Sequence, residues 1–263
     1  MLMEDPDIEF RTGWDQTDIP CRVMPGGSFE EERCREQALT FGTFESEMKR
    51  RALEFGEEQM RSLKLIREDG LYTNPALLLS DQCPFTTTIS LFQGPDRELF
   101  RDRKEFSGSI LKQAADAYEL LDFCNRTRAS FSKMGRTDVR DYPEEAVREA
   151  LLNSVVHRDY SYRESTRIQL SGDRLETVSP GELDPCLELK SIFLGASIMR
   201  NPNLAEVFYR LRLANGCGSG IRRILHAYGD FSQKPQFETA RGVFRVILPN
   251  RNCEGPCALP DQR

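Results

Sequence analysis

The chain has 263 residues, of which 39% are hydrophobic and 30% charged, and its net charge is −6. No apolar run approaches the roughly 18 residues that span a bilayer, and the acidic start MLMEDPDIEF lacks the apolar core of an export signal. We therefore expect a cytoplasmic protein without a membrane partner, and the acidic balance argues against a chain wholly devoted to nucleic-acid binding.

The N-terminal part predicts a loose segment followed by helices. Residues 1–29 contain several prolines and glycines and have no sustained periodicity. Residues 30–66 are rich in Glu, Lys, Arg, Met and Leu, which predicts helices with a break around Phe41–Thr43. Asp69 and Gly70 then indicate a turn.

Strands and a long helix are expected next. The short apolar run Ala76–Leu79 and the alternating run Thr86–Phe92 predict strands. Ser107–Asn125 has helical periodicity. The polar connector Arg126–Asp141 contains one expected short strand near Ser130–Met134.

The C-terminal half mixes both element types. A helix is predicted from Pro143, in its first turn, to His157, with Asp141 as the cap. The other expected elements are a strand pair at Arg167–Leu170 and Leu175–Val178, helices at Asn203–Leu211 and Ser219–Tyr228, and a strand pair at Gln236–Thr239 and Val243–Leu248. This mixture predicts an α+β fold, built as an α/β sandwich with a helical N-terminal segment.

The helix 142–157 carries polar side chains at every fourth position, and these fall on one stripe. They are Glu145, Glu149, Asn153 and His157, with Val147, Leu151 and Val155 on the opposite, buried side. Spacing alone favours a solvated polar face. The alternative is a site, because an amide oxygen suits Mg²⁺ and a carboxylate one turn away can orient or deprotonate a water.

A glycine-rich turn, Gly216–Ile221, opens the expected helix 219–228. Such a turn presents backbone N–H groups and a helix N-terminus to an anion. A helix C-cap followed by a tight turn explains the same residues equally well. Ser179-Pro180-Gly181, after the strand 175–178, is by itself only a turn.

Four motifs in this order are more specific than any one of them. They are REALLNSVVHRDYS at 148–161, DRLETVSPGEL at 173–183, RNPNLAEVFYRLRL at 200–213 and GCGSGIRRI at 216–224. Over residues 70–250 the set resembles the divergent GHKL-like ATP-binding domain, also called RecG-like C-terminal, of transcriptional regulators that carry a Schlafen-type AlbA domain. The resemblance implies a GHKL/Bergerat-like sandwich that binds ATP and Mg²⁺.

The resemblance also implies roles for individual residues. Asn153 matches the Mg²⁺ ligand, Glu149 the general base, and Gly181 the adenine-side glycine. The phosphate side is matched by Gly218 and Gly220, with Ser219 between them. The family keeps His157, Arg158 and Asp159, which either close the nucleotide pocket or fix the end of the helix. Ser179 replaces an aspartate of the GHKL pattern, which removes a charge-assisted acceptor for adenine and implies weak hydrolysis at most.

The resemblance divides the chain into four parts. Residues 1–40 are expected to be the remnant of an AlbA-like DNA-binding module, 41–135 a helix–strand lead-in, 136–250 the ATP-binding domain and 251–263 a flexible tail. The implied function is a nucleotide-sensing transcriptional regulator that reaches DNA through truncated modules and is able to form a homodimer. The alternatives are a degenerate scaffold for protein interactions and an ATPase in DNA transactions, although no P-loop motif occurs.

The eight cysteines include no C-x-x-C pair, and the chain has two histidines. The sequence therefore offers a poor ligand set for a Cys/His zinc site, and without an export signal we expect reduced thiols rather than disulfides.

Overall fold

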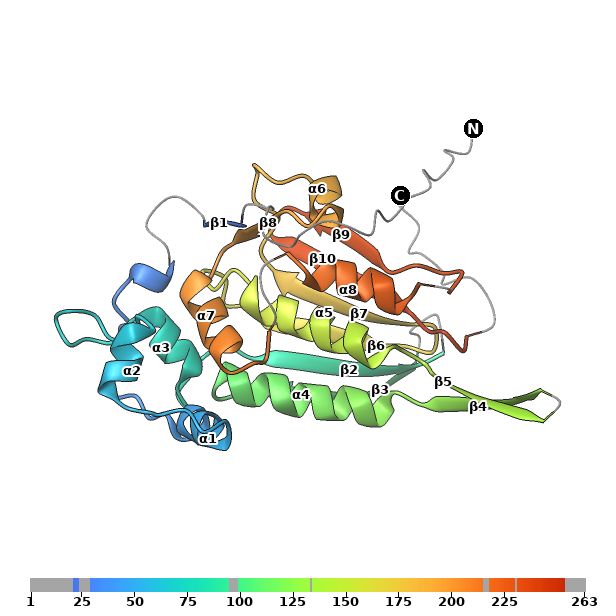
Figure 1. Ribbon diagram of the computed structural model, residues 1–263, viewed down its shortest axis with the longest axis horizontal. Helices are drawn as coiled ribbons and strands as arrows, with labels where there is room; N and C mark the ends of the chain where they lie inside the picture. Colours follow the sequence, from blue (N-terminus) through green and yellow to red (C-terminus); the bar gives the residue numbers. More distant parts are fainter. Residues whose placement is uncertain are drawn as a thin grey trace.

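A six-stranded mixed sheet forms the centre of the computed structural model, which describes residues 21–23, 29–94, 99–132, 134–214, 218–229 and 231–253 (Figure 1). The strand order is β3-β2-β6-β7-β10-β9, with β2 and β6 parallel and all other neighbours antiparallel. The strands are β2 (Thr87–Gln93), β3 (Leu99–Phe106), β6 (Thr166–Leu170), β7 (Arg174–Pro180), β9 (Gln236–Ala240) and β10 (Val243–Pro249). The sheet thus consists of three sequential hairpins.

Three helices cover one face of this sheet, as Figure 1 shows: α4 (Ile110–Cys124), α5 (Glu144–Val156) and α8 (Gly220–Ala227). Apolar side chains from both layers form the core between them, including Ile89, Leu151, Ile168, Leu175 and Val246. The two packed layers confirm the predicted α+β sandwich.

A second core joins the N-terminal helices to the sandwich. It contains α1 (Gly42–Arg50), α2 (Glu57–Ser62), α3 (Asn74–Leu79) and α7 (Pro202–Arg210), which pack against Leu152, Val155 and Val156 on α5. In the short 3-10 helix Phe29–Glu31, the buried Glu30 carboxylate accepts bonds from the backbone N–H groups of Asn203 and Leu204, each at 2.8 Å. This carboxylate therefore caps the first turn of α7 from a distant part of the chain.

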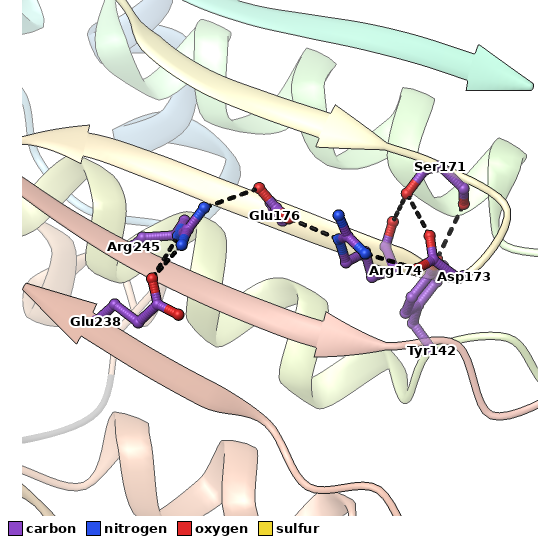
Figure 2. A network of polar contacts seen from close by, with 7 residues as sticks. All are labelled: Tyr142, Ser171, Asp173, Arg174, Glu176, Glu238 and Arg245. Carbon is purple, nitrogen blue, oxygen red and sulfur yellow. Dashed lines mark hydrogen bonds and ion pairs between the residues drawn. The ribbon is translucent and has the colours of Figure 1, made fainter. Parts of the chain in front are cut away.

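The face of the sheet opposite the helices carries a charged ladder (Figure 2). Leu175 points into the helix-covered core, so its neighbours Arg174 and Glu176 point to the other face. Arg174 donates to Asp173 and to Glu176, both at 2.7 Å, and Arg245 lies 3.7 Å from the other oxygen of Glu176. Arg174 and Glu176 are nearly inaccessible, at 7% and 2% side-chain exposure, so the ladder is a buried ionic network.

Two local predictions are wrong. Ala76–Leu79 was expected to be a strand but belongs to helix α3, because Pro75 occupies the first turn and periodicity cannot separate a short buried helix from a strand. Asp141 was expected to cap α5, yet the helix has no side-chain cap at its N-terminus. The Asp141 carboxylate instead accepts a bond from Asn252 Nδ2 at 2.8 Å.

Other elements were not predicted in full. The single strand expected near Ser130–Met134 is a complete hairpin of β4 (Thr127–Ser132) and β5 (Gly135–Arg140). Edge strand β3, helix α6 (Leu189–Phe193) and the parallel pair β1 (Cys21–Val23) and β8 (Ser197–Met199) had no counterpart in the prediction.

Several expectations fall where the structure gives no description. These are the loose character of residues 1–20 and 24–28, the tail beyond residue 253, and the first part of the glycine-rich turn at 216–217. In the described part of the chain, these cysteines are not joined in disulfides: Cys34, Cys83, Cys124, Cys186 and Cys253. Among the described helices, none combines the length and apolarity that crossing a membrane requires.

Candidate functional site

A cavity of about 420 Å³ lies between the C-terminal half of α5, the end of β7 and the N-terminus of α8. This volume is within the range of small-molecule sites. Eight of the ten predicted site residues line it: Glu149, Asn153, His157, Ser179, Gly181, Gly218, Ser219 and Gly220. The fold therefore brings the polar stripe of α5 and both glycine turns to one cavity.

The start of α8 lies directly against the α5 stripe. A Cβ placed on Gly220 would lie 2.8 Å from Asn153 Nδ2 and 3.2 Å from Glu149 Oε2. A larger residue at this position would displace the Asn153 amide, so the backbone of α8 approaches the α5 stripe closely because residue 220 is glycine. The free backbone N–H groups of the first turn of α8 are thus placed beside the amide and the carboxylate.

Glu149 is buried and flanked by two arginines. Its Oε1 lies 3.2 Å from Arg148 Nη1 and 3.5 Å from Arg223 Nη1. Burial raises the pKa of Glu149, and the two neighbouring guanidinium groups oppose that rise. A buried carboxylate with a raised pKa is a better proton acceptor than an exposed one, which fits a general base.

His157 ends α5 and is neutral at pH 7. Its backbone N–H donates to the Asn153 carbonyl at 3.0 Å, and the residue lines the cavity. Burial, and to a smaller extent the charge of Arg200, lowers the pKa of His157 to about 4. A neutral imidazole is able both to donate and to accept a hydrogen bond.

The lowered pKa of His157 predicts a loss of stability in acid. The unfolded chain takes up a proton near pH 6.5 and the folded chain only near pH 4, so the free energy of unfolding falls as pH drops through this window. His157→Gln should lack this contribution to the slope in urea unfolding measured across the window. His226→Gln, which removes the exposed histidine of α8, is the matched control. A pH-independent difference between His157→Gln and wild type would contradict the assignment.

The other two predicted residues do not line the cavity. The Arg158 guanidinium lies over the rings of Phe85 and Tyr160, at 5.0 and 5.1 Å, and donates to the Thr86 carbonyl. Asp159 accepts a bond from the Ser161 backbone N–H at 2.9 Å. Both side chains hold the segment that follows α5.

Arg200 is a cavity residue for which the sequence predicted no role. Its guanidinium donates to the Glu182 carbonyl at 2.7 Å and lies 3.4 Å from the Asp159 carboxylate. A Cβ on Gly181, whose φ is +112°, would approach Arg200 Nη1 to 2.1 Å. Arg200 thus covers Gly181, and it opens a motif that sequence analysis recognised without assigning a function to its first residue.

The segment between β7 and α7 forms an apolar wall of the cavity. Leu183, Leu187, Ile192 and Met199 all face it. The segment also contacts the glycine-rich turn, because a Cβ on Gly218 would lie 2.2 Å from the Gly195 carbonyl oxygen. Sequence reasoning expected only one loop here, since the apolar residues of the segment have no regular spacing.

The oxygen donors that line the cavity suit a metal cation that takes its remaining ligands from a bound molecule. Among the described residues, no three His, Cys, Asp or Glu side chains are grouped as a metal site. Asn153 offers one hard amide oxygen, which fits Mg²⁺ because that ion usually keeps several waters and takes further oxygens from a bound phosphate. The Ser179 hydroxyl donates to the Phe244 carbonyl at 3.4 Å and keeps its acceptor capacity.

The α/β sandwich is consistent with the fold of ATPase domains. Residues 164–248 match the family described as "Putative ATP-dependent DNA helicase recG C-terminal". The match supports a RecG-like, GHKL-type domain and includes Ser179, Gly181 and the turn 218–220, whereas α5 lies before it.

A solved structure has the same fold. It is the crystal structure of the DIP2311 protein from Corynebacterium diphtheriae, with a TM-score of 0.68 and 22% sequence identity over 88% of this chain. The alignment covers 47% of the DIP2311 chain, so the present chain spans less than half of that protein. No curated protein matches the sequence.

Proposed function

We propose that the cavity binds ATP together with Mg²⁺ and that the protein is a nucleotide-sensing regulator. One observation carries the proposal: Glu149 and Asn153 on α5 meet the N-terminus of α8 at Gly220, inside a domain with an ATPase-type family match. A hard oxygen donor, a carboxylate and a helix N-terminus are the groups that a magnesium–triphosphate unit requires.

Each wall of the cavity has a role in this proposal. The backbone of 218–220 would hold the phosphates and Asn153 the Mg²⁺, which neutralises phosphate charge when bound. The adenine would lie toward Ser179 and Gly181, against the apolar wall of residues 183–199. Ser179 accepts a hydrogen bond there as a neutral hydroxyl, so adenine selectivity is expected to be modest.

The charge of the cavity favours the magnesium complex over free ATP. Its described lining includes four carboxylates, Glu149, Glu182, Asp184 and Glu206, and a single arginine, Arg200. A free polyanion would be repelled by this balance, and a bound divalent cation offsets the repulsion. Binding is therefore expected to require Mg²⁺.

The test is the melting temperature of the full chain with millimolar Mg-ATP, with ATP and EDTA, and without ligand. A ligand that binds only the folded state adds about 2.7 kcal/mol at a hundredfold excess over its Kd. A shift with Mg-ATP and none with EDTA supports the proposal. No shift with ATP, ADP or GTP would overturn it and favour the degenerate scaffold.

A second candidate function is a weak ATPase, favoured by the burial and raised pKa of Glu149. Glu149→Gln should retain the thermal shift with Mg-ATP and lose phosphate release by at least about a hundredfold, the scale of one general base. Glu145→Gln, one turn earlier on α5 and outside the cavity, is the control. Turnover that survives in Glu149→Gln would remove the ATPase candidate.

The wider role is inferred from the Schlafen-type resemblance of the four motifs. In this role the protein would be a cytoplasmic transcriptional regulator that binds DNA and forms a homodimer. Its domain limits would be those expected from the sequence, with the ATP-binding domain at 136–250. ATP would act by binding one arrangement of the protein better than another and so shifting their populations.

A further inference from the structure

The β4–β5 hairpin projects from the sandwich between α4 and α5 (Figure 1). Its six residue pairs run from Thr127↔Arg140 to Ser132↔Gly135. Every described side chain from residue 126 to 138 is exposed. A two-stranded ribbon that packs on no core is only marginally stable in water, so the hairpin is better suited to contact a partner than to stabilise the domain.

The base of this hairpin is held firmly. Asn125 exchanges two hydrogen bonds with the backbone of Tyr142, both at 2.9 Å. Asn252 donates to the Val139 carbonyl at 2.9 Å, and the Asp141 N–H donates to the Arg126 carbonyl at 2.8 Å. The ribbon therefore leaves the domain in a fixed direction, which limits the entropy lost when it binds.

The hairpin is basic although the chain as a whole is acidic. Residues 126–140 contain five arginines or lysines and one aspartate: Arg126, Arg128, Lys133, Arg136, Arg140 and Asp138. Short hydroxyl side chains, Thr127, Ser130 and Thr137, lie between the bases along the strands. Arginines and hydroxyls are typical donors to phosphate oxygens.

Two exposed apolar side chains lie near the end of the hairpin. Phe131 is 77% exposed and Met134 is fully exposed. The Arg136 guanidinium lies 6.0 Å from the centre of the Phe131 ring, directly across the ribbon. Exposed apolar side chains beside arginines suit a partner surface that combines negative charge with aromatic rings or methyl groups.

We propose that the β4–β5 hairpin is an arm that binds duplex DNA in the major groove, a function separate from nucleotide binding in the cavity. The major groove of B-DNA admits a two-stranded ribbon, and its thymine methyl groups accept apolar side chains such as Phe131. The major groove of A-form RNA is too deep and narrow for side chains to read. Arg128 and Arg136 contact phosphates on the groove walls, and Arg136 exchanges its exposed ion pair with Asp138 (2.8 Å) for this contact.

The first experiment measures fluorescence anisotropy of a labelled mixed-sequence DNA duplex with the full chain, without ATP, at about 50 to 200 mM salt. Arg128→Ala/Arg136→Ala should weaken binding by at least about tenfold and reduce the salt slope by about 1.8, the value for two phosphate contacts. Lys49→Ala/Arg61→Ala removes the same charge from α1 and α2, far from the hairpin in Figure 1, and should bind as wild type.

A second variant tests the apolar end directly. Phe131→Trp adds a second tryptophan to a chain that has one, and its emission should shift when DNA is added, beyond any change in the wild-type signal. All replaced side chains are exposed, so the melting temperature should stay near that of wild type.

Three results would overturn the proposal. The first is equal DNA affinity of the hairpin and control variants, or no binding by the wild type at low salt. The second is equal or tighter binding to duplex RNA. The third is a wild-type dimer that dissociates in Phe131→Ser, which would make the hairpin a contact between two copies of the chain. None of these measurements depends on the nucleotide site.

Discussion

Asn153→Ala is expected to abolish the thermal stabilisation by Mg-ATP. The amide is the hard oxygen donor at the cavity, and alanine leaves the cation with phosphate and water oxygens alone beside several carboxylates. At a hundredfold excess of ligand over the wild-type Kd, the expected loss is most of about 2.7 kcal/mol. Differential scanning fluorimetry with and without Mg-ATP measures it.

Two further variants sharpen this experiment. Asn153→Asp keeps an oxygen ligand at the same place and should retain part of the shift. Glu145→Ala lies on the same stripe of α5 but outside the cavity, and it should behave as wild type. An unchanged Mg-ATP shift in Asn153→Ala would show that Asn153 is no ligand.

Glu176→Ala is expected to give the largest loss of stability, about 3 kcal/mol or more. The change removes the carboxylate from the centre of the ladder in Figure 2 and leaves Arg174 and Arg245 with fewer partners on the sheet. Removing one partner from a buried ionic network is strongly unfavourable because the desolvated charges that remain lose part of their compensation, although Arg174 keeps Asp173 and Arg245 keeps Glu238. Urea unfolding at pH 7 measures the difference in free energy.

The control for this variant is at the accessible end of the same ladder. Glu238 on β9 accepts a bond from Arg245 Nε at 2.8 Å and is 36% exposed. Glu238→Ala should cost about 1 kcal/mol or less, as exposed ion pairs do. Equal losses in the two variants would contradict the role of burial in this ladder.

The sequence predicted those elements whose patterns are local. The helices α4 and α5 have long periodic apolar spacing, and the β6–β7 hairpin has a Ser-Gly-Asp turn between apolar runs. Such patterns arise within one element, so they can be recognised in the sequence without knowledge of the tertiary structure. Of these elements, α5 and β7 line the cavity, so one part of its wall lies on elements that the sequence predicted correctly.

The sequence did not predict elements whose residue types are determined by contacts with distant parts of the chain. Strand β3 reads LFRDRKEF and is exposed along nearly its whole length, as suits an edge strand, so it lacks an alternating pattern. Helix α3 is short and almost wholly buried, which gives the same apolar run as a buried strand.

The same difference between local patterns and tertiary contacts applies to the residues of the site. Glu149 and Asn153 could be grouped from the sequence because their spacing of four places them on one face of a helix, and both line the cavity. Arg200 and the wall of residues 183–199 were missed, because their place at the cavity depends on how an irregular segment packs across the end of β7. The proximity of Gly220 to Asn153 also depends on tertiary packing. The family resemblance implied this proximity, whereas no local sequence pattern predicted it.

The three-hairpin sheet has a consequence for how the protein folds. Each hairpin closes locally, but two joins between hairpins are long-range: β2 to β6, where Thr86 and Ser165 hydroxyls meet at 2.5 Å across 79 residues, and β7 to β10. Closing such long loops slows folding. The second join pairs Ser179 with Phe244, and both line the cavity. The cavity is complete only when this long-range join has formed, so ligand binding reports on the pairing of β7 with β10.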